Sequence, residues 1–282
     1  MKEEEIKKVV REGYGRIAAQ GGSCCFPSVS CCGSTPSAET ISRQVGYSQE
    51  EIQAVPEGAN LGLGCGNPLA LASIKEGEVV LDLGSGAGFD CFLAARQVGE
   101  NGKVIGVDMT PEMIAKAREN ARKGGFQNVE FRLGEIENLP AADNTADLII
   151  SNCVVNLAPD KKRVFREAFR VLKPQGRIMI SDIVWLREIP KALLESVGAY
   201  VACLAGAVKQ EEYLEAVKAA GFEKVRVVEE TPVPFDLFQG DPLGQTLMKQ
   251  MNLSPEQLQS GIRNVVSVKV EAYKPAAGQG AG

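Results

Sequence analysis

Three cysteines stand where a thiol can do chemistry. Cys65 lies in the glycine-rich stretch "NLGLGCGNP", Cys153 in "SNCVVNL" and Cys203 in "YVACLAGAV". The chain has eight cysteines and no histidine, which excludes Ser-His and Cys-His nucleophile pairs and every His-ligated metal site. Sulfur is therefore the expected ligand for any metal chemistry, and thiolates favour soft or thiophilic centres over magnesium or calcium.

The other five cysteines suggest different roles. Cys91 lies on the predicted helix face "FDCFLAA", where a free cysteine usually acts as a small buried hydrophobe. The segment "CCFPSVSCC" carries two vicinal pairs, Cys24–Cys25 and Cys31–Cys32. A zinc role for these pairs remains an alternative, although C-C-x5-C-C lacks the usual C-x2-4-C spacing. The chain is long and shows no secretory signal, so reduced thiols are expected rather than disulfides.

The composition excludes several kinds of partner. The 282 residues are 44% hydrophobic and 24% charged, which is typical of a soluble globular protein. With a net charge of -5, the chain shows no basic surface for nucleic acid or anionic lipid. Its charged N-terminus lacks a signal-peptide core, and no apolar run approaches the roughly 20 residues of a membrane span. The sequence predicts a cytoplasmic protein without nucleic-acid or membrane partners.

Alternating strand and helix patterns predict the fold class. Apolar runs predict strands at 78–84, 103–109, 129–134, 146–152 and 176–184, and two late strands near 224–229 and 264–273. Helical patterns cover 3–19, 89–98, 110–125 and 161–176, and Ser48 and Glu51 fit a capping box before another helix. Continuous apolar strands alternating with helices indicate an α/β fold whose mostly parallel sheet is covered on both faces.

These elements divide the chain into five expected segments. The expected segments are an N-terminal helical and Cys-rich segment (1–70), a nucleotide-binding core (71–184), a helical insert near the substrate site (185–222), C-terminal strands that complete the sheet (223–275) and a tail (276–282).

A glycine loop follows the first core strand in "VVLDLGSGAGFD". Gly84, Gly86 and Gly88 fall between a strand and a helix, where a ligand can reach backbone N–H groups and the helix N-terminus. Asp108 ends the next strand, where a carboxylate can accept hydrogen bonds from ribose hydroxyls. The dinucleotide pattern G-x-G-x-x-G is incomplete, and together with Asp82 inside the strand this fits an adenosyl ligand better than NAD.

The glycine loop resembles the first motif of class I S-adenosylmethionine methyltransferases, which implies a Rossmann-like fold. The stretch "LGEIENLP" resembles the motif after the third strand of that fold. The strings "GANLGLGCGNPLALASIKEGEVVLDLGSGAGFDC", "SNCVVNLAPDKKRVFREAFRVLKPQG" and "CLAGA" resemble prokaryotic arsenite S-adenosylmethionine methyltransferases more specifically. This similarity runs from about residue 10 to about residue 230.

The resemblance implies a function and a set of site residues. It implies methylation of trivalent arsenic, with Cys65, Cys153 and Cys203 as arsenic ligands and catalytic thiols, and a further thiol from the N-terminal segment: Cys24, Cys25, Cys31 or Cys32. The cofactor is S-adenosylmethionine, and thioredoxin or a small thiol supplies electrons. Besides Asp82, the resemblance places these residues in the cofactor site: Gly84, Ser85, Gly86, Asp108, Met109, Glu135, Ile136 and Asn152.

The chemistry expected from this resemblance needs no general base. Trivalent arsenic held by three thiolates keeps a lone pair that can attack the sulfonium methyl group, so a protein without histidine can catalyse the transfer by positioning. We expect the glycines around Cys65 to let this thiol approach Cys153 and Cys203. Two other functions stay open from the residues: methylation of a small organic acceptor such as a quinone, and a non-catalytic thiol-based sensor or sequestration protein for metalloids.

Overall fold

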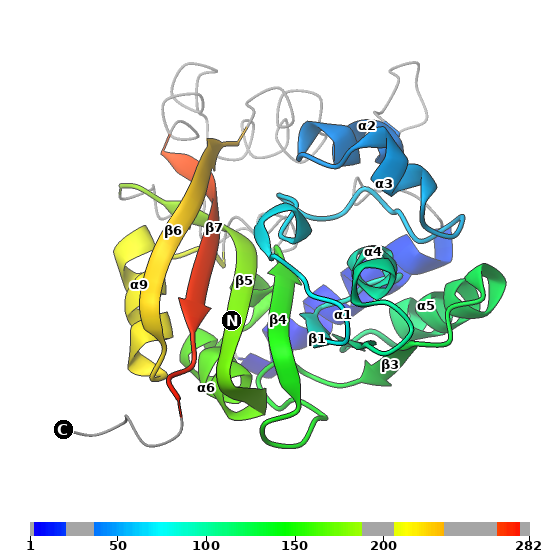
Figure 1. Cartoon of the computed structure of the whole chain (residues 1–282). Helices are drawn as coiled ribbons and strands as arrows, with labels where there is room; N and C mark the ends of the chain where they lie inside the picture. Colours follow the sequence, from blue (N-terminus) through cyan, green and yellow to red (C-terminus); the bar gives the residue numbers. More distant parts are fainter. Residues whose placement is uncertain (1–2, 21–36, 188–205, 234–263, 277–282) are drawn as a thin grey trace, which may run out of the picture.

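A single seven-stranded sheet organises the protein. The computed structural model describes residues 3–20, 37–187, 206–233 and 264–276. The strand order is β3-β2-β1-β4-β5-β7-β6 (Figure 1). The strands are β1 (Val79–Leu83), β2 (Lys103–Asp108), β3 (Val129–Leu133), β4 (Ala146–Asn152), β5 (Leu172–Trp185), β6 (Glu223–Pro232) and β7 (Val265–Tyr273). The first five run parallel, and β7 is antiparallel to both β5 and β6, which confirms the mostly parallel sheet.

Helices cover both faces of this sheet. The described helices are α1 (Glu3–Gln20), α2 (Ala38–Gln44), α3 (Gln49–Gln53), α4 (Phe89–Val98), α5 (Pro111–Gly124), α6 (Lys161–Val171) and α9 (Gln210–Ala219), with short 3-10 turns η1 (Leu69–Leu71) and η2 (Val155–Leu157). Consecutive residues of one strand point to opposite faces. Leu81 packs with Phe165 of α6 and Tyr213 of α9, whereas Val80 packs with Phe92 of α4.

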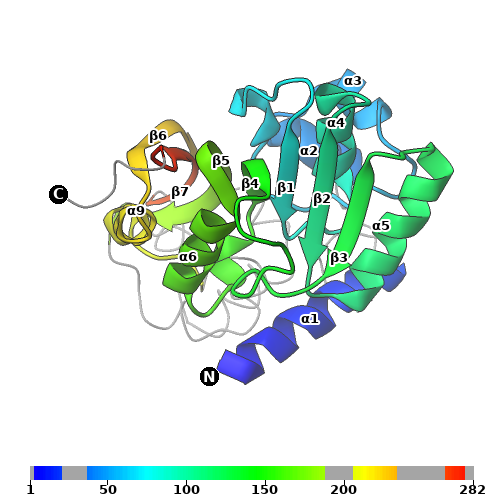
Figure 2. The ribbon, with the colours of Figure 1, turned by 60° about the horizontal axis from the view of Figure 1, so that its bottom comes forward.

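Helix α1 connects two regions of the molecule. It lies beside α5 (Figure 2), where Ile17 packs against the buried Met113. Nearer its N-terminus, Val10 belongs to the apolar cluster that contains Cys153. The N-terminal helix therefore covers the carboxyl edge of the sheet, where parallel α/β folds bind ligands.

Local sequence signals set most helix ends, with one wrong prediction. Ser48 and Glu51 form the predicted capping box. The helix predicted at 161–176 ends instead at Val171, and β5 starts at Leu172. Pro174 disfavours the helical conformation of the residue before it, so the chain is already extended at this point. The sequence analysis also missed α2. The part of the insert at 188–205 lies outside the described residues.

In the part of the chain that the structure describes, no helix has the length and apolar character to cross a membrane.

A nearly buried ion pair fixes the segment that leads into β1. Arg177 of β5 donates to both carboxylate oxygens of Glu78 at 2.7 and 2.9 Å. It also donates to the carbonyl oxygens of Ala72 and Ser73 at 3.0 and 2.7 Å. Arg177 therefore anchors to the sheet the segment that follows the Cys65 loop.

We expect Arg177→Ala to lower the free energy of unfolding by about 3 kcal/mol, because it leaves Glu78 poorly solvated and unpaired. Chemical denaturation measures this change. The matched control is Arg226→Ala, which removes an arginine that is 65% exposed and leaves Glu271 its hydrogen bond from the Tyr273 hydroxyl, so it should cost less than about 1 kcal/mol. Equal effects of the two substitutions would contradict this account.

Candidate functional site

The turn after β1 leaves space for a ligand at one glycine. Gly84, Gly86 and Gly88 all have positive φ, at 74°, 51° and 96°. A Cβ on Gly84 would meet the side chain of Val154, and one on Gly88 would meet Phe92 at 2.7 Å, so both serve packing. A Cβ on Gly86 would have nothing within 4 Å. Neighbouring side chains therefore fill the space next to Gly84 and Gly88, whereas the space next to Gly86 is free for a ligand.

Polar groups around this open space fit an adenosyl ligand. Asp108 accepts hydrogen bonds from the backbone N–H of Gly86 at 2.9 Å and of Thr110 at 2.8 Å, and burial raises its pKa. The hydroxyl of Ser85 is buried and has no hydrogen-bond partner among the described residues. A buried polar atom without a partner is costly. These residues therefore fit a polar ligand bound against the turn.

Asp82 lies inside β1, shortly before the turn, and accepts a hydrogen bond from a neighbouring side chain. The buried thiol of Cys91 donates to its carboxylate at 3.2 Å, and burial raises the pKa of Asp82 well above its usual value. Cys91 is fully buried, as the sequence predicts.

The loop after β3 contacts helix α1. Glu135 accepts from Lys7 at 2.8 Å and lies 3.5 Å from Arg11. Lys7 also pairs with the buried Glu137 at 3.2 Å, while Ile136 packs in the core. The sequence analysis missed Lys7 and Arg11, because nothing in the local sequence shows which loop a distant amphipathic helix covers.

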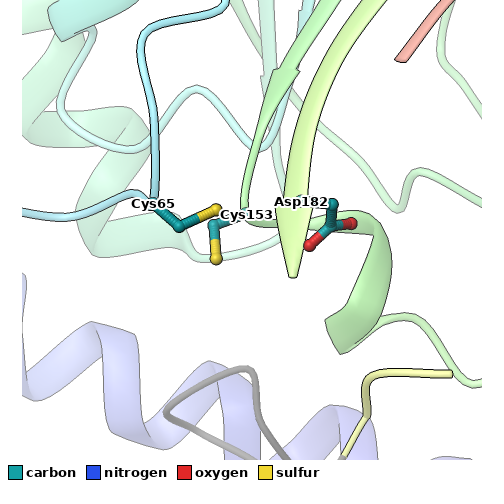
Figure 3. A group of neighbouring side chains, drawn as sticks. All are labelled: Cys65, Cys153 and Asp182. Atoms are coloured by element: carbon teal, nitrogen blue, oxygen red, sulfur yellow. The ribbon is translucent and has the colours of Figure 1, made fainter. Parts of the chain in front are cut away.

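Two of the predicted thiols meet at the carboxyl edge of the sheet. Figure 3 shows Cys65, Cys153 and Asp182 together, and their ligand atoms all lie within 4.8 Å of one another. Cys65 comes from the loop before η1, Cys153 follows β4, and Asp182 lies in β5. Cys153 has a positive φ of 62°, an uncommon conformation for a residue with a side chain that often occurs at functional sites.

The backbone of Cys65 is fixed at several points. Its N–H donates to Oδ1 of Asn152 at 3.0 Å, and the Nδ2 of Asn152 donates to the carbonyl of Gly66 at 2.7 Å. From β7, the Ser267 hydroxyl donates to the Cys65 carbonyl at 2.8 Å. Cys65 thus lies beside Cys153 with its backbone held in place by Asn152 and Ser267. The family resemblance assigns Asn152 to the cofactor site.

The glycines on either side of Cys65 permit this close contact. A Cβ on Gly64 would come within 2.7–2.8 Å of the Asn152 side chain, and Gly64 has a φ of 107°. A Cβ on Gly66 would collide with the Ser181 hydroxyl. Glycine is therefore required at both positions for the loop to approach β4 and β5.

Asp182 is a site residue that the sequence analysis missed. Its carboxylate accepts hydrogen bonds from the backbone N–H of Asn156 at 3.1 Å and from the Tyr213 hydroxyl at 3.2 Å. Burial raises the pKa of Asp182 to about 7. Its position near the end of a strand next to β4 is a signal that could have identified it.

An apolar cluster surrounds the two thiols and reaches the cofactor turn. Cys65 and Met109 both pack against the buried residues of this cluster: Val10, Cys153, Leu157, Ile183, Trp185, Ala207 and Val265. Because Met109 follows Asp108 directly, the thiol pair and the predicted cofactor site share one wall. Two adjacent thiols in such surroundings can hold a thiophilic centre away from water.

Cys203 and the possible resolving thiols Cys24, Cys25, Cys31 and Cys32 lie outside the described residues.

The chain is similar to known methyltransferases. A family model described as a methyltransferase domain matches residues 74–221. The chain is 46% identical to the arsenite methyltransferase of Halobacterium salinarum, over 97% of this chain and 68% of that protein. It is 34% identical to the human arsenite methyltransferase, over 81% of this chain and 61% of that protein. The chain thus spans roughly two thirds of the length of these relatives.

A solved structure shows the same similarity. An arsenic(III) S-adenosylmethionine methyltransferase from Chlamydomonas reinhardtii matches with a TM-score of 0.62 and 33% identity, covering 87% of this chain and 76% of that one.

The open space at Gly86 leads to a direct prediction. We expect Gly86→Ala to weaken binding of S-adenosylhomocysteine by at least about tenfold, because the new methyl group would occupy the ligand's space. Isothermal titration calorimetry measures the affinity. Gly125→Ala is the matched control, since Gly125 also has a positive φ, 69°, and nothing within 4 Å of a Cβ. Equal loss of affinity in both variants would contradict a ligand at Gly86.

Proposed function

The chain belongs to the arsenite methyltransferase family of S-adenosylmethionine-dependent enzymes, and we propose that it methylates trivalent arsenic held by the thiolates of Cys65 and Cys153. The observation that carries this proposal is the meeting of the two sulfur atoms within 4.8 Å in an apolar cluster that Met109 shares. We include Cys203 as a third ligand on the family resemblance.

The cofactor site of this proposal is the turn after β1 and its neighbours. S-adenosylmethionine supplies an electrophilic methyl group when it is bound. Gly86 offers the open space, Ser85 a buried hydroxyl without a partner among the described residues, and Asp108 a carboxylate at the edge of the turn. Glu135 and Ile136 line the same site in this proposal, together with Met109.

The protein's part in the reaction is mainly positioning. Arsenic bound by thiolates keeps a lone pair, so accepting a methyl group requires no general base, which suits a chain without histidine. Fixing a reactant next to its partner can contribute roughly 7–11 kcal/mol. The fixed backbone of Cys65 and the apolar cluster around the thiols hold arsenic in one place and limit its contact with water.

We further propose that thiols supply the electrons that methylation consumes. Transfer of a methyl cation to arsenic formally oxidises it from the trivalent to the pentavalent state. Two thiols that form a disulfide return two electrons, and thioredoxin or a small thiol then reduces the disulfide. An N-terminal cysteine among Cys24, Cys25, Cys31 and Cys32 is the proposed resolving thiol. A reducing compartment such as the cytoplasm suits this cycle.

Arsenic speciation tests the proposed function directly. The reduced protein is incubated with S-adenosylmethionine, arsenite and a thiol reductant, and the methylated arsenicals formed are quantified by mass spectrometry. We expect Cys65→Ser and Cys153→Ser to lower turnover by about 100-fold or more, because arsenic loses a ligand that positions it. Cys91→Ser is the matched control, since a hydroxyl can still donate to Asp82.

Two outcomes would contradict the proposed function. Full activity toward an organic acceptor in both cysteine variants would indicate incidental thiols. Tight arsenite binding by the wild type without production of S-adenosylhomocysteine would indicate a sensor or sequestration protein.

A further inference from the structure

A chain of buried hydrogen bonds leads to Cys65 from the opposite side of the site. Tyr47, which follows α2, donates its hydroxyl proton to Oδ1 of Asp90 in α4 at 2.5 Å. The same hydroxyl oxygen accepts from Nδ2 of Asn152 at 2.9 Å. The Nδ2 atom of Asn152 also lies 3.2 Å from Oδ2 of Asp90. Tyr47 and Asp90 are both buried, and neither was singled out in the sequence.

This chain fixes which way the Asn152 amide points. An ionised Asp90 can only accept hydrogen bonds. The Tyr47 hydroxyl donates its one hydrogen to Asp90, so towards Asn152 it can only accept. The NH2 group of Asn152 must therefore face Tyr47 and Asp90, which turns its carbonyl oxygen toward the N–H of Cys65. Burial raises the pKa of Asp90 to about 6, whereas the hydrogen bonds from Tyr47 and Asn152 stabilise its ionised form.

Burying a carboxylate for this purpose is costly. A buried charge is disfavoured unless hydrogen bonds compensate it, and apolar residues of the same volume often give equal or greater stability. Tyr47 packs edge-on against Phe89 at 4.8 Å between ring centroids, so its ring would fill the space without the hydroxyl. The polar groups here are better explained by the orientation they impose than by stability.

We propose that Asn152, oriented by Tyr47 and Asp90, is a positioning residue that presents Cys65 to arsenic beside Cys153. This role rests on the proposed function of Cys65 as an arsenic ligand. It assigns no contact with arsenic to Asn152, Tyr47 or Asp90. Their effect reaches the metalloid through the backbone of Cys65 and Gly66.

The test compares two ligands on the full chain. Phenylarsonous acid, a trivalent arsenical with two exchangeable oxygen ligands, probes the thiol pair, and S-adenosylhomocysteine probes the cofactor site. Asn152→Asp replaces the donor to Gly66 by an acceptor, and Tyr47→Phe removes only the hydroxyl. We expect each to weaken phenylarsonous acid binding by about tenfold, since one buried hydrogen bond is lost, and to change the S-adenosylhomocysteine affinity less than twofold.

Steady-state kinetics give a second measurement. A positioning role raises the KM for arsenite more than the KM for S-adenosylmethionine, whereas general loss of structure affects both. Tyr273→Phe is the matched control, because it also removes a tyrosine hydroxyl from a hydrogen bond with a carboxylate, that of Glu271. If Asn152→Asp does not fold, Tyr47→Phe still carries the test, since its ring packing is kept.

The outcomes separate this inference from the proposed function. If Cys65→Ser binds phenylarsonous acid as tightly as the wild type, the proposed function is wrong. If Cys65→Ser weakens binding but Asn152→Asp and Tyr47→Phe do not, the positioning role is wrong. A loss confined to S-adenosylhomocysteine affinity in Asn152→Asp would also overturn it and make Asn152 a cofactor residue.

Discussion

Two hydrogen bonds between Asn152 and the backbone of Cys65 and Gly66 connect the N-terminal part of the chain to the sheet. The Asn152 amide accepts from the N–H of Cys65 and donates to the carbonyl of Gly66, so the loop lies against the end of β4. Such contact is possible only without side chains at Gly64 and Gly66. The glycines therefore allow the loop to lie close to β4 and β5, and this places the Cys65 thiol beside Cys153.

The thiol pair and the cofactor turn depend on the same covering elements. Helix α1 contributes Val10 to the apolar cluster around Cys153, and its Lys7 pairs with Glu135 and Glu137 in the loop after β3. One helix thus covers the thiols with apolar side chains and the proposed cofactor loop with charged ones. Since β7 also fixes Cys65 through Ser267, segments from both ends of the chain complete a site whose floor is the parallel sheet.

The sequence predicted the parts that depend on local pattern. Apolar runs predict strands β1 and β2, and the conformational freedom of glycine predicts the turn after β1. The structure has both strands and the turn at these positions, with Asp108 as the last residue of β2. The contacts that fix the site were missed because they join distant residues: Lys7 and Glu135 are 128 residues apart, and Cys65 and Ser267 are 202 apart. The cofactor role of Asn152 came from the family resemblance alone, and the hydrogen bonds of its amide with Cys65 and Gly66 could not be read from the sequence, because position along a strand does not show which way an amide points.

The most direct test of the account is X-ray absorption spectroscopy at the arsenic edge, on reduced protein loaded with one equivalent of arsenite. If Cys65 and Cys153 hold the metalloid, arsenic in the wild type has sulfur neighbours only, and Cys65→Ser and Cys153→Ser each replace a sulfur neighbour by oxygen. Oxygen coordination in the wild type, or an unchanged number of sulfur neighbours in both variants, would contradict the account.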